Sequence, residues 1–178
     1  QKMEEIRVLE DKVFHVDLNG WLENEFLTWE WWLLVGFLIL PWLVWLKLAK
    51  REWLLGSLLF GTTIMIITIF LDTLGIQFSF WEYPVELIPI IPRAFPFDIS
   101  LIPVAYMLIF QYFKKWKSYI IAQVILAITY AFIGEPFCQW IDLVNYTNWA
   151  YLYSFIYYII AGISIRAILL KIMAYSHD

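Results

Sequence analysis

The sequence has a single cysteine, Cys138, so no disulfide can form within the chain, and the redox compartment is left open. It lacks a P-loop, a dinucleotide-binding glycine pattern, a paired-cysteine metal motif and a basic nucleic-acid patch. ATP hydrolysis and nucleic-acid binding therefore have no support, and neither a cofactor nor a metal is indicated. There is no internal repeat. The first residues are charged and mixed, so no cleavable signal peptide is expected.

Charge is also scarce. Only 16% of the 178 residues are charged, whereas 62% are hydrophobic and 20% aromatic, and the mean hydropathy is +0.70. A soluble domain carries about 25% charged residues. A chain this short cannot hide so much apolar surface in one water-soluble core. The composition therefore predicts that a lipid bilayer is the solvent for most of the protein.

Five apolar stretches have lengths close to the roughly 20 residues that a helix needs to cross a bilayer. The third is the shortest and contains Pro103. We expect an all-α polytopic membrane helix bundle with five transmembrane helices. The predicted spans are Trp31–Leu48, Trp53–Ile76, Asp98–Phe113, Tyr119–Phe137 and Trp149–Leu170.

The basic residues predict the orientation. Lysine and arginine gather in the turns after the first and third stretches and near the end of the fifth, whereas the loops after the second and fourth stretches hold only Arg93. Cytoplasmic loops are richer in these residues, and tryptophans near the ends of the stretches agree as interfacial belts. We therefore expect an outer N-terminus and a cytoplasmic C-terminus.

The first 29 residues are the one stretch with soluble character. Met3, Ile6, Leu9 and Val13 recur at three- and four-residue spacing among charged residues, which predicts an amphipathic helix that ends before Asn19-Gly20. The chain thus divides into an extracytoplasmic N-terminal segment, 1–29, and a transmembrane domain, 30–178. Residues 1–20 either lie on a surface or dock a protein partner.

Acidic residues converge on the predicted outer face. An ionisable group at bilayer depth costs about 2.5–3.5 kcal/mol or more unless it faces protein, water or a partner. That cost bears most on Asp72 and Glu135, which have apolar neighbours and lie late in the second and fourth stretches. The six acidic residues are Glu30, Asp72, Glu82, Glu86, Asp98 and Glu135.

Structural roles compete with functional ones at three of these positions. Asp98 is interpreted as a helix N-cap. Asp72 is either structural, paired with Arg93, or functional. Glu135 precedes Pro136, and because the residue before proline is pushed from helical geometry, a kink there either aims the carboxylate into a cavity or ends the helix.

A proline-rich outer loop joins the second and third stretches. Residues 77–97 contain four prolines but are too apolar for a solvated loop. Proline interrupts helices, and irregular backbone at membrane depth requires cover by protein or contact with water. We expect a segment lying at the interface or re-entering against the bundle, anchored by Trp81, Tyr83 and Phe95, either as a structural plug or as a ligand lid.

Several short sequence elements stand out along the predicted spans and loops. They are Asp72-Thr73-Leu74-Gly75, Trp81-Glu82-Tyr83-Pro84, Leu87-Ile88-Pro89, Phe97-Asp98, Ile102-Pro103, Gln111-Tyr112, Glu135-Pro136 and Trp149. Together they are similar to those of an uncharacterised family of small multi-pass membrane proteins common in spore-forming Bacillota. The resemblance covers roughly residues 25–170 and implies a bacterial cell-membrane protein, with no activity and no catalytic residues to carry over. One departure is Glu86, where the family is often basic.

Three functions remain open. The leading hypothesis is a non-enzymatic protein with an outward-facing acidic and aromatic pocket for a small ligand, a cation or a lipid headgroup. The second is an accessory or scaffold subunit that docks a partner through residues 1–20. The third is an intramembrane enzyme or transporter that uses the outer carboxylates, which no nucleophile–base pair or internal repeat supports. The candidate ligand-binding residues are Asp72, Tyr83, Glu86, Arg93, Asp98 and Glu135.

Overall fold

The computed structural model describes residues 1–90 and 92–175. Residue 91, in the predicted loop, and residues 176–178, at the end of the predicted transmembrane domain, lie outside the described part. The described chain is almost entirely helical. Its elements are α1 (Lys2–Gly20), η1 (Trp21–Glu25), α2 (Trp29–Leu48), η2 (Arg51–Trp53), α3 (Leu54–Gln77), β1 (Trp81–Glu82), η3 (Phe97–Leu101), α4 (Ile102–Tyr112), α5 (Trp116–Thr129), η4 (Tyr130–Gly134), α6 (Glu135–Trp140), β2 (Asn145–Tyr146) and α7 (Tyr151–Tyr175).

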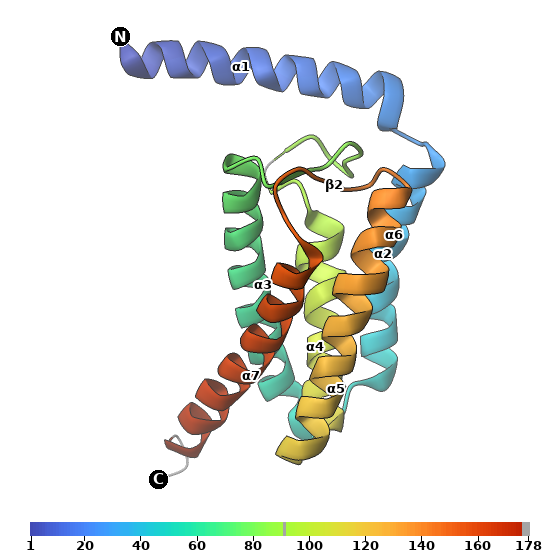
Figure 1. The fold of residues 1–178 in the computed structure, drawn as a ribbon, viewed down its shortest axis with the longest axis vertical. Helices are drawn as coiled ribbons and strands as arrows, with labels where there is room; N and C mark the ends of the chain where they lie inside the picture. The colour runs from blue at the N-terminus through green and yellow to red at the C-terminus, as the bar shows by residue number, and fades with distance from the viewer. Residues whose placement is uncertain (91, 176–178) are drawn as a thin grey trace.

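The helices from α2 to α7 form one bundle, and α1 lies across one end of it (Figure 1). The long members α2, α3, α4, the continuous run α5–η4–α6, and α7 all extend between the same two ends. The C-terminal end of α7 lies far from α1. We call the end beneath α1 the α1 end and the other the opposite end.

Four helical runs of the described chain are long and apolar enough to cross a membrane: Trp29–Leu48, Arg51–Gln77, Trp116–Trp140 and Tyr151–Tyr175. The all-α prediction is confirmed, and these four helices agree with a membrane location. The remaining predicted span corresponds to the shorter apolar run Phe97–Tyr112. At 1.5 Å per residue this run covers roughly 24 Å, somewhat less than the roughly 30 Å of a bilayer core.

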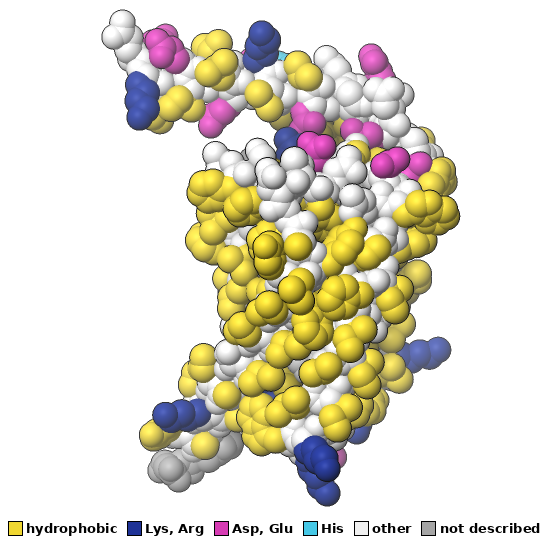
Figure 2. Space-filling model, viewed as in Figure 1, with side chains coloured by type: hydrophobic (Ala, Val, Ile, Leu, Met, Phe, Trp, Pro, Cys, Tyr) yellow, Lys and Arg dark blue, Asp and Glu magenta, His cyan; other side chains and the backbone are white. Residues whose placement is uncertain are grey.

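The distribution of side chains on the surface agrees with these candidate membrane spans. Apolar side chains cover the middle of the bundle on the face drawn in Figure 2, while lysine and arginine gather at the opposite end. Acidic side chains lie at the α1 end and along α1 itself. Exposed apolar side chains such as Leu55, Ile66 and Phe70, each more than 60% exposed, belong to the candidate spans and suit contact with lipid.

The predicted end of the N-terminal helix is wrong. α1 includes Gly20, which keeps right-handed helical angles (φ −57°, ψ −45°), and η1 continues the helical path. The Asn24 side-chain amide donates to the Gly20 carbonyl oxygen over 3.1 Å and so satisfies an acceptor near the end of α1. The chain leaves the helix only before Leu27, where φ is +66°.

Small residues allow close helix contacts inside the bundle. A Cβ placed on Gly61 of α3 would lie 2.3 Å from the sulfur of Met107 on α4. A Cβ on Gly162 of α7 would lie 2.4 Å from the side-chain carbon of Gln123 on α5. Gln123 itself donates to the Tyr158 carbonyl over 3.0 Å. Small residues and interhelical hydrogen bonds are the usual means of helix association in lipid.

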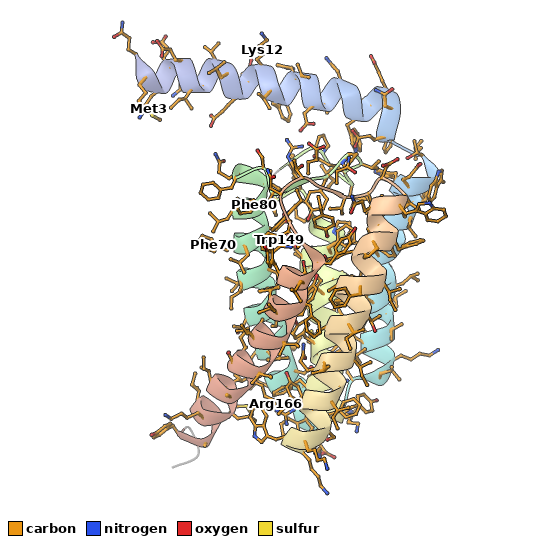
Figure 3. All side chains as sticks on the ribbon, in the orientation of Figure 1. Met3, Lys12, Phe70, Phe80, Trp149 and Arg166 are labelled. Carbon is orange, nitrogen blue, oxygen red and sulfur yellow. The ribbon has the colours of Figure 1, made fainter. Side chains whose placement is uncertain are left out.

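The opposite end is tied together by polar side chains. The buried Arg166 of α7 donates to the carbonyl oxygens of Phe113 and Lys114, each over 2.7 Å, and so satisfies acceptors just beyond the end of α4. Its guanidinium carbon also lies 3.9 Å from the ring centre of Tyr119. Figure 3 shows Arg166 between α7 and its neighbours at this end.

Candidate functional site

A cavity of about 530 Å³ lies within the bundle near the α1 end. Its wall comes from α3, η3, η4, α6 and α7, and from the irregular segments that include β1 and β2. Three carboxyl groups line it: Asp72, Asp98 and Glu135. We call it the carboxylate cavity. Aromatic side chains supply much of the remaining wall: Phe78, Phe80, Trp81, Tyr83, Phe97, Tyr130, Tyr146, Trp149, Tyr157 and Tyr158.

Asp72 is held in the cavity by two donors. Its Oδ1 accepts from the Trp81 indole N–H over 2.8 Å and from the Tyr83 hydroxyl over 2.5 Å. The side chain is 94% buried, and its second oxygen, Oδ2, has no hydrogen-bond partner. Trp81 reaches Asp72 because Gly75, one turn further along α3, has no side chain: a Cβ there would lie 1.9 Å from the Trp81 ring.

Asp98 enters the cavity from a π-helical turn. It is the second residue of η3, is 2% exposed, and its Oδ2 has no hydrogen-bond partner. The prediction that Asp98 caps a helix is wrong, because the N-cap position is Pro96 and no side chain caps the turn. The carboxyl group points into the protein instead of back to the backbone. An unpartnered buried oxygen costs about 1–3 kcal/mol.

Glu135 enters from a second π-helical turn. The prediction that Pro136 pushes Glu135 out of helical geometry is wrong, because Glu135 keeps helical angles (φ −61°, ψ −48°) and its N–H donates to the carbonyl of Tyr130, the first residue of η4. The helix continues through Pro136 in α6, and Glu135 lines the cavity, which was one of the two alternatives. The wider turn lets proline follow without ending the helix. Glu135 Oε1 accepts from the Tyr158 hydroxyl over 3.0 Å, whereas Oε2 is buried without a partner.

The two π-helical turns share one arrangement. In each, the residue directly before a proline, Ile102 or Glu135, donates to the carbonyl five residues earlier. Each turn contributes a carboxyl group to the cavity, from within η3 in one case and from the residue after η4 in the other. π-helical turns are frequent at functional sites because they alter which side chains face inward.

Four aromatic residues cover the cavity at the α1 end: Phe80, Trp81, Tyr146 and Trp149, here called the aromatic cap. β1 pairs antiparallel with β2, with Trp81 opposite Tyr146. The Trp81 and Trp149 ring centres lie 4.9 Å apart, and those of Phe80 and Trp149 lie 5.7 Å apart. Figure 3 shows Phe80 and Trp149 together near the α1 ends of α3 and α7.

Burial and nearby carboxyl groups shift the pKa values of two tyrosines outside the spans. Burial, followed by the nearby charges of Asp72 and Asp98, raises the pKa of the Tyr83 phenol well above its usual value. Burial and the neighbouring Glu135 carboxyl likewise raise the pKa of Tyr146. Both phenols therefore stay protonated and can act as donors toward the carboxylate cavity.

Glu86 and Arg93, also predicted for the pocket, lie outside the carboxylate cavity. They form an ion-pair group with Asp17 and Glu25, here called the α1 cluster. Arg93 donates to the Glu86 carboxylate and pairs with Asp17 over 2.9 Å. The Glu86 N–H donates to Glu25 over 2.7 Å. The alternative that Arg93 pairs with Asp72 is therefore wrong, because Arg93 is engaged by the N-terminal segment.

The carboxylates do not form a metal site. Among the described residues, no group of three or more histidine, cysteine, aspartate or glutamate side chains could hold a metal ion. The carboxyl groups instead face one cavity from three separate elements, α3, η3 and α6. Such a spread suits a ligand with spatial extent better than a single ion.

Sequence reasoning missed two groups of site residues. Asp17 and Glu25 were assigned to the soluble N-terminal segment. Their negative charge, opposite in sign to that of Arg93, was the signal that could have placed them beside it. Tyr158 was not singled out, although its place on an apolar helix opposite Glu135 makes it a donor. Comparison with known proteins adds nothing to this picture: no protein-family model, curated protein or solved structure matches the chain. The fold and site define a helical protein of membrane type with an acidic, aromatic cavity.

Replacing Asp72 with alanine is expected to loosen the aromatic cap. Trp81 and Tyr83 would lose a shared acceptor, and hydrogen bonds to a charged group contribute roughly 1.5–3 kcal/mol. The backbone N–H groups of Thr147 and Asn148 donate to the Phe80 carbonyl and report whether the cap is closed. Amide hydrogen exchange at both is expected to be at least about tenfold faster.

Thr73→Ala is the matched control. Thr73 neighbours Asp72 but is exposed, and its hydroxyl donates only to the Ile69 carbonyl of its own helix. Exchange at Thr147 and Asn148 should be unchanged in this variant. Equal exchange rates in Asp72→Ala and Thr73→Ala would show that Asp72 does not hold the cap.

The α1 cluster is expected to weaken as pH rises. The pKa of Glu86 is raised from 4.5 to about 7 because burial outweighs the opposing effect of Arg93, and the nearby carboxylates of Asp17 and Glu25 act in the same direction as burial. Between these pH values the docked protein holds a proton at Glu86 that the undocked protein has released. The contribution of Glu86 to docking is therefore fully present below about pH 4.5 and is lost as pH rises through about 7.

Pulsed electron spin resonance can measure this docking. With spin labels at Val8→Cys and Thr147→Cys in a Cys138→Ala background, the distance distribution is expected to broaden from pH 5 to pH 8. Adding Glu86→Gln should remove the broadening, since glutamine does not titrate. Broadening that persists with glutamine would assign the effect to other groups.

Proposed function

We propose that the chain is a non-enzymatic membrane protein whose carboxylate cavity binds a small molecule that presents a positive charge or hydrogen-bond donors. One observation carries the proposal. Asp72, Asp98 and Glu135 line a single cavity, and each has a buried carboxyl oxygen without a hydrogen-bond partner among the described residues. Most buried polar atoms in proteins are paired, so three such oxygens in one place require an explanation.

The energetic cost supports an external donor. Trp81 and Tyr83 donate to Asp72, and Tyr158 donates to Glu135. The side chains of Ser154 and Tyr146 also interact with the Glu135 carboxyl group. A carboxylate accepts up to about four hydrogen bonds, so acceptor capacity remains. A bound cation would satisfy the free oxygens, and the aromatic faces around it would add cation–π attraction of about 0.5–2 kcal/mol each.

The cavity dimensions agree with a small molecule. Ligand pockets range over about 300–1,000 Å³ and combine apolar walls with a few polar groups. The volume of about 530 Å³ and the aromatic wall fit that description. Because the described residues offer no metal cluster, an organic cation or amine fits better than a bare metal ion.

We also propose the full topology: five membrane crossings, an outer N-terminus and a cytoplasmic C-terminus in a bacterial cell membrane. Lysine and arginine at the opposite end support this orientation (Figure 2). The family resemblance supports the cellular location, and half of the residues that carry it line the carboxylate cavity: Asp72, Leu74, Gly75, Trp81, Tyr83, Phe97, Asp98, Ile102, Glu135 and Trp149.

Reporter fusions test the topology. A fluorescent protein that folds only in the cytoplasm should be bright when fused after residue 178 or inserted after Lys115, and dark when inserted after Asn148. Alkaline phosphatase, which is active only outside, should give the reverse pattern. If the fluorescent protein were bright at both the Lys115 and Asn148 sites, or dark at both, a crossing by α5–η4–α6 would be ruled out.

Native mass spectrometry tests the binding function. The gently solubilised protein is expected to retain a small molecule that is absent from a folded Asp72→Asn/Glu135→Gln variant. The matched control is Glu82→Gln/Asp142→Asn, which neutralises two exposed carboxylates outside the cavity. It should retain the molecule, and thermal unfolding should confirm that both double variants are folded.

One observation favours a second function. α1 buries no side chain and leaves Met3, Val8, Leu9 and Val13 more than half exposed. An accessory subunit that docks a protein partner through residues 1–20 would use this surface. In that case the spectra of the wild type and both variants would be ligand-free and identical, and deletion of residues 1–20 would abolish complex formation.

A further inference from the structure

The exposure of two lining side chains indicates that the carboxylate cavity opens beside α3. Among the residues that line it, Leu71 and Phe78 are the two exposed ones, with exposed fractions of 38% and 63%. Leu71, Leu74 and Phe78 recur at spacings of three and four residues and so share one face of the helix. Leu71 and Leu74 belong to the candidate span Arg51–Gln77, and Phe78 follows it directly, so this face meets lipid.

The other sides of the cavity are more closed. The aromatic cap covers the α1 end through the Trp81–Trp149 contact. Towards the opposite end, Thr68 of α3 and Tyr157 of α7 share a hydrogen bond of 2.9 Å between their hydroxyl oxygens, which joins the two helices. The most direct route for a ligand therefore lies between the aromatic cap and the Thr68–Tyr157 hydrogen bond, past Leu71 and Phe78.

Polarity is divided across the cavity. The unpartnered oxygens of Asp72, Asp98 and Glu135 lie inside, whereas the side chains at the opening are apolar. An occupant that satisfies both parts has a polar head within and a hydrocarbon chain towards the lipid. Its tail then remains in apolar surroundings and is not driven into water.

The charge of the head follows from the lining. Among the described residues, those lining the cavity that commonly carry charge are all acidic, with no lysine, arginine or histidine. A fatty acid would bring a further negative charge, and a phospholipid would bring a phosphate, without a cation to meet either. A primary or quaternary ammonium group meets both the carboxyl oxygens and the aromatic faces.

We infer that the protein takes up a single-chain cationic amphiphile, such as a long-chain amine, laterally from the bilayer through the opening at Leu71 and Phe78. This inference rests on the proposed binding function and names its ligand class and its route. The ammonium head lies among Asp72, Asp98 and Glu135, and the chain leaves the cavity past the apolar face of α3.

Photo-crosslinking in lipid nanodiscs tests the ligand class. Three probes share one hydrocarbon chain with a diazirine near its end, and they differ only in the head: dodecylamine, dodecanol and dodecanoic acid. The amine is expected to label the protein at least about tenfold more than the alcohol or the acid at equal membrane concentration. Unlabelled dodecylamine should compete, and Asp72→Asn/Glu135→Gln should abolish the preference.

The positions of the crosslinks test the route. Mass spectrometry of peptides should place them around Leu71 and Phe78 of α3. Leu71→Trp narrows the opening and is expected to reduce labelling several-fold. Phe70→Trp is the matched control, because Phe70 is a neighbouring lipid-facing residue that does not line the cavity (Figure 3). Thermal unfolding should show that both variants are folded.

Two results would overturn the inference. Equal labelling by the three probes would exclude a cationic head as the recognised group. Saturable labelling confined to α1 or the aromatic cap, or unaffected by Leu71→Trp, would exclude entry beside α3. If native mass spectrometry still finds a water-soluble molecule that depends on Asp72 and Glu135, the proposed function survives and this inference alone fails. If neither experiment finds a ligand, both fail.

Discussion

The carboxyl group of Asp72 is the interaction on which the candidate site depends. Through one oxygen it holds Trp81 and Tyr83, and these two side chains fix the segment that follows α3. That segment carries β1, whose pairing with β2 fixes the connection between α6 and α7. Without this acceptor, the apolar and proline-rich connection would lose the side-chain hydrogen bonds that tie it to α3. Gly75 is the sequence requirement, since any side chain there would occupy the space of the Trp81 ring.

A membrane environment explains why the polar groups are arranged in this way. Backbone groups in lipid must be satisfied within the protein, so a proline in a span usually requires local adjustment. Here the adjustment is a π-helical turn before Pro103 and another before Pro136. Both turns face the cavity and bring Asp98 and Glu135 to it. The same backbone irregularity that accommodates proline therefore also places two of the three carboxyl groups.

The sequence predicted the helices better than the site. The predicted spans overlap the helices closely, because twenty apolar residues bounded by Lys50 or Lys115 leave few alternatives in lipid. Of the residues predicted for one site, Asp72, Tyr83, Asp98 and Glu135 do line the same cavity. Glu86 and Arg93 were wrongly assigned to the cavity because their partners, Asp17 and Glu25, lie in the N-terminal segment. Hydrophobic periodicity does not show where that segment crosses the bundle. The π-helical turns were missed because these stretches are apolar on almost every side. Their hydrophobic pattern therefore has no phase that an inserted residue would visibly shift.

The contrast between the two acidic groups bears most directly on function. In the α1 cluster, Arg93 contacts Asp17 and Glu86, so the chain itself supplies the positive charge that three carboxylates require. In the carboxylate cavity, Asp72 and Glu135 receive only neutral donors, and none of the described residues that line the wall is basic. A purely structural site would be more stable with a paired charge or an apolar replacement, because a buried unpaired charge destabilises the fold. Under the proposed function, the ligand supplies the positive charge that the described cavity wall lacks.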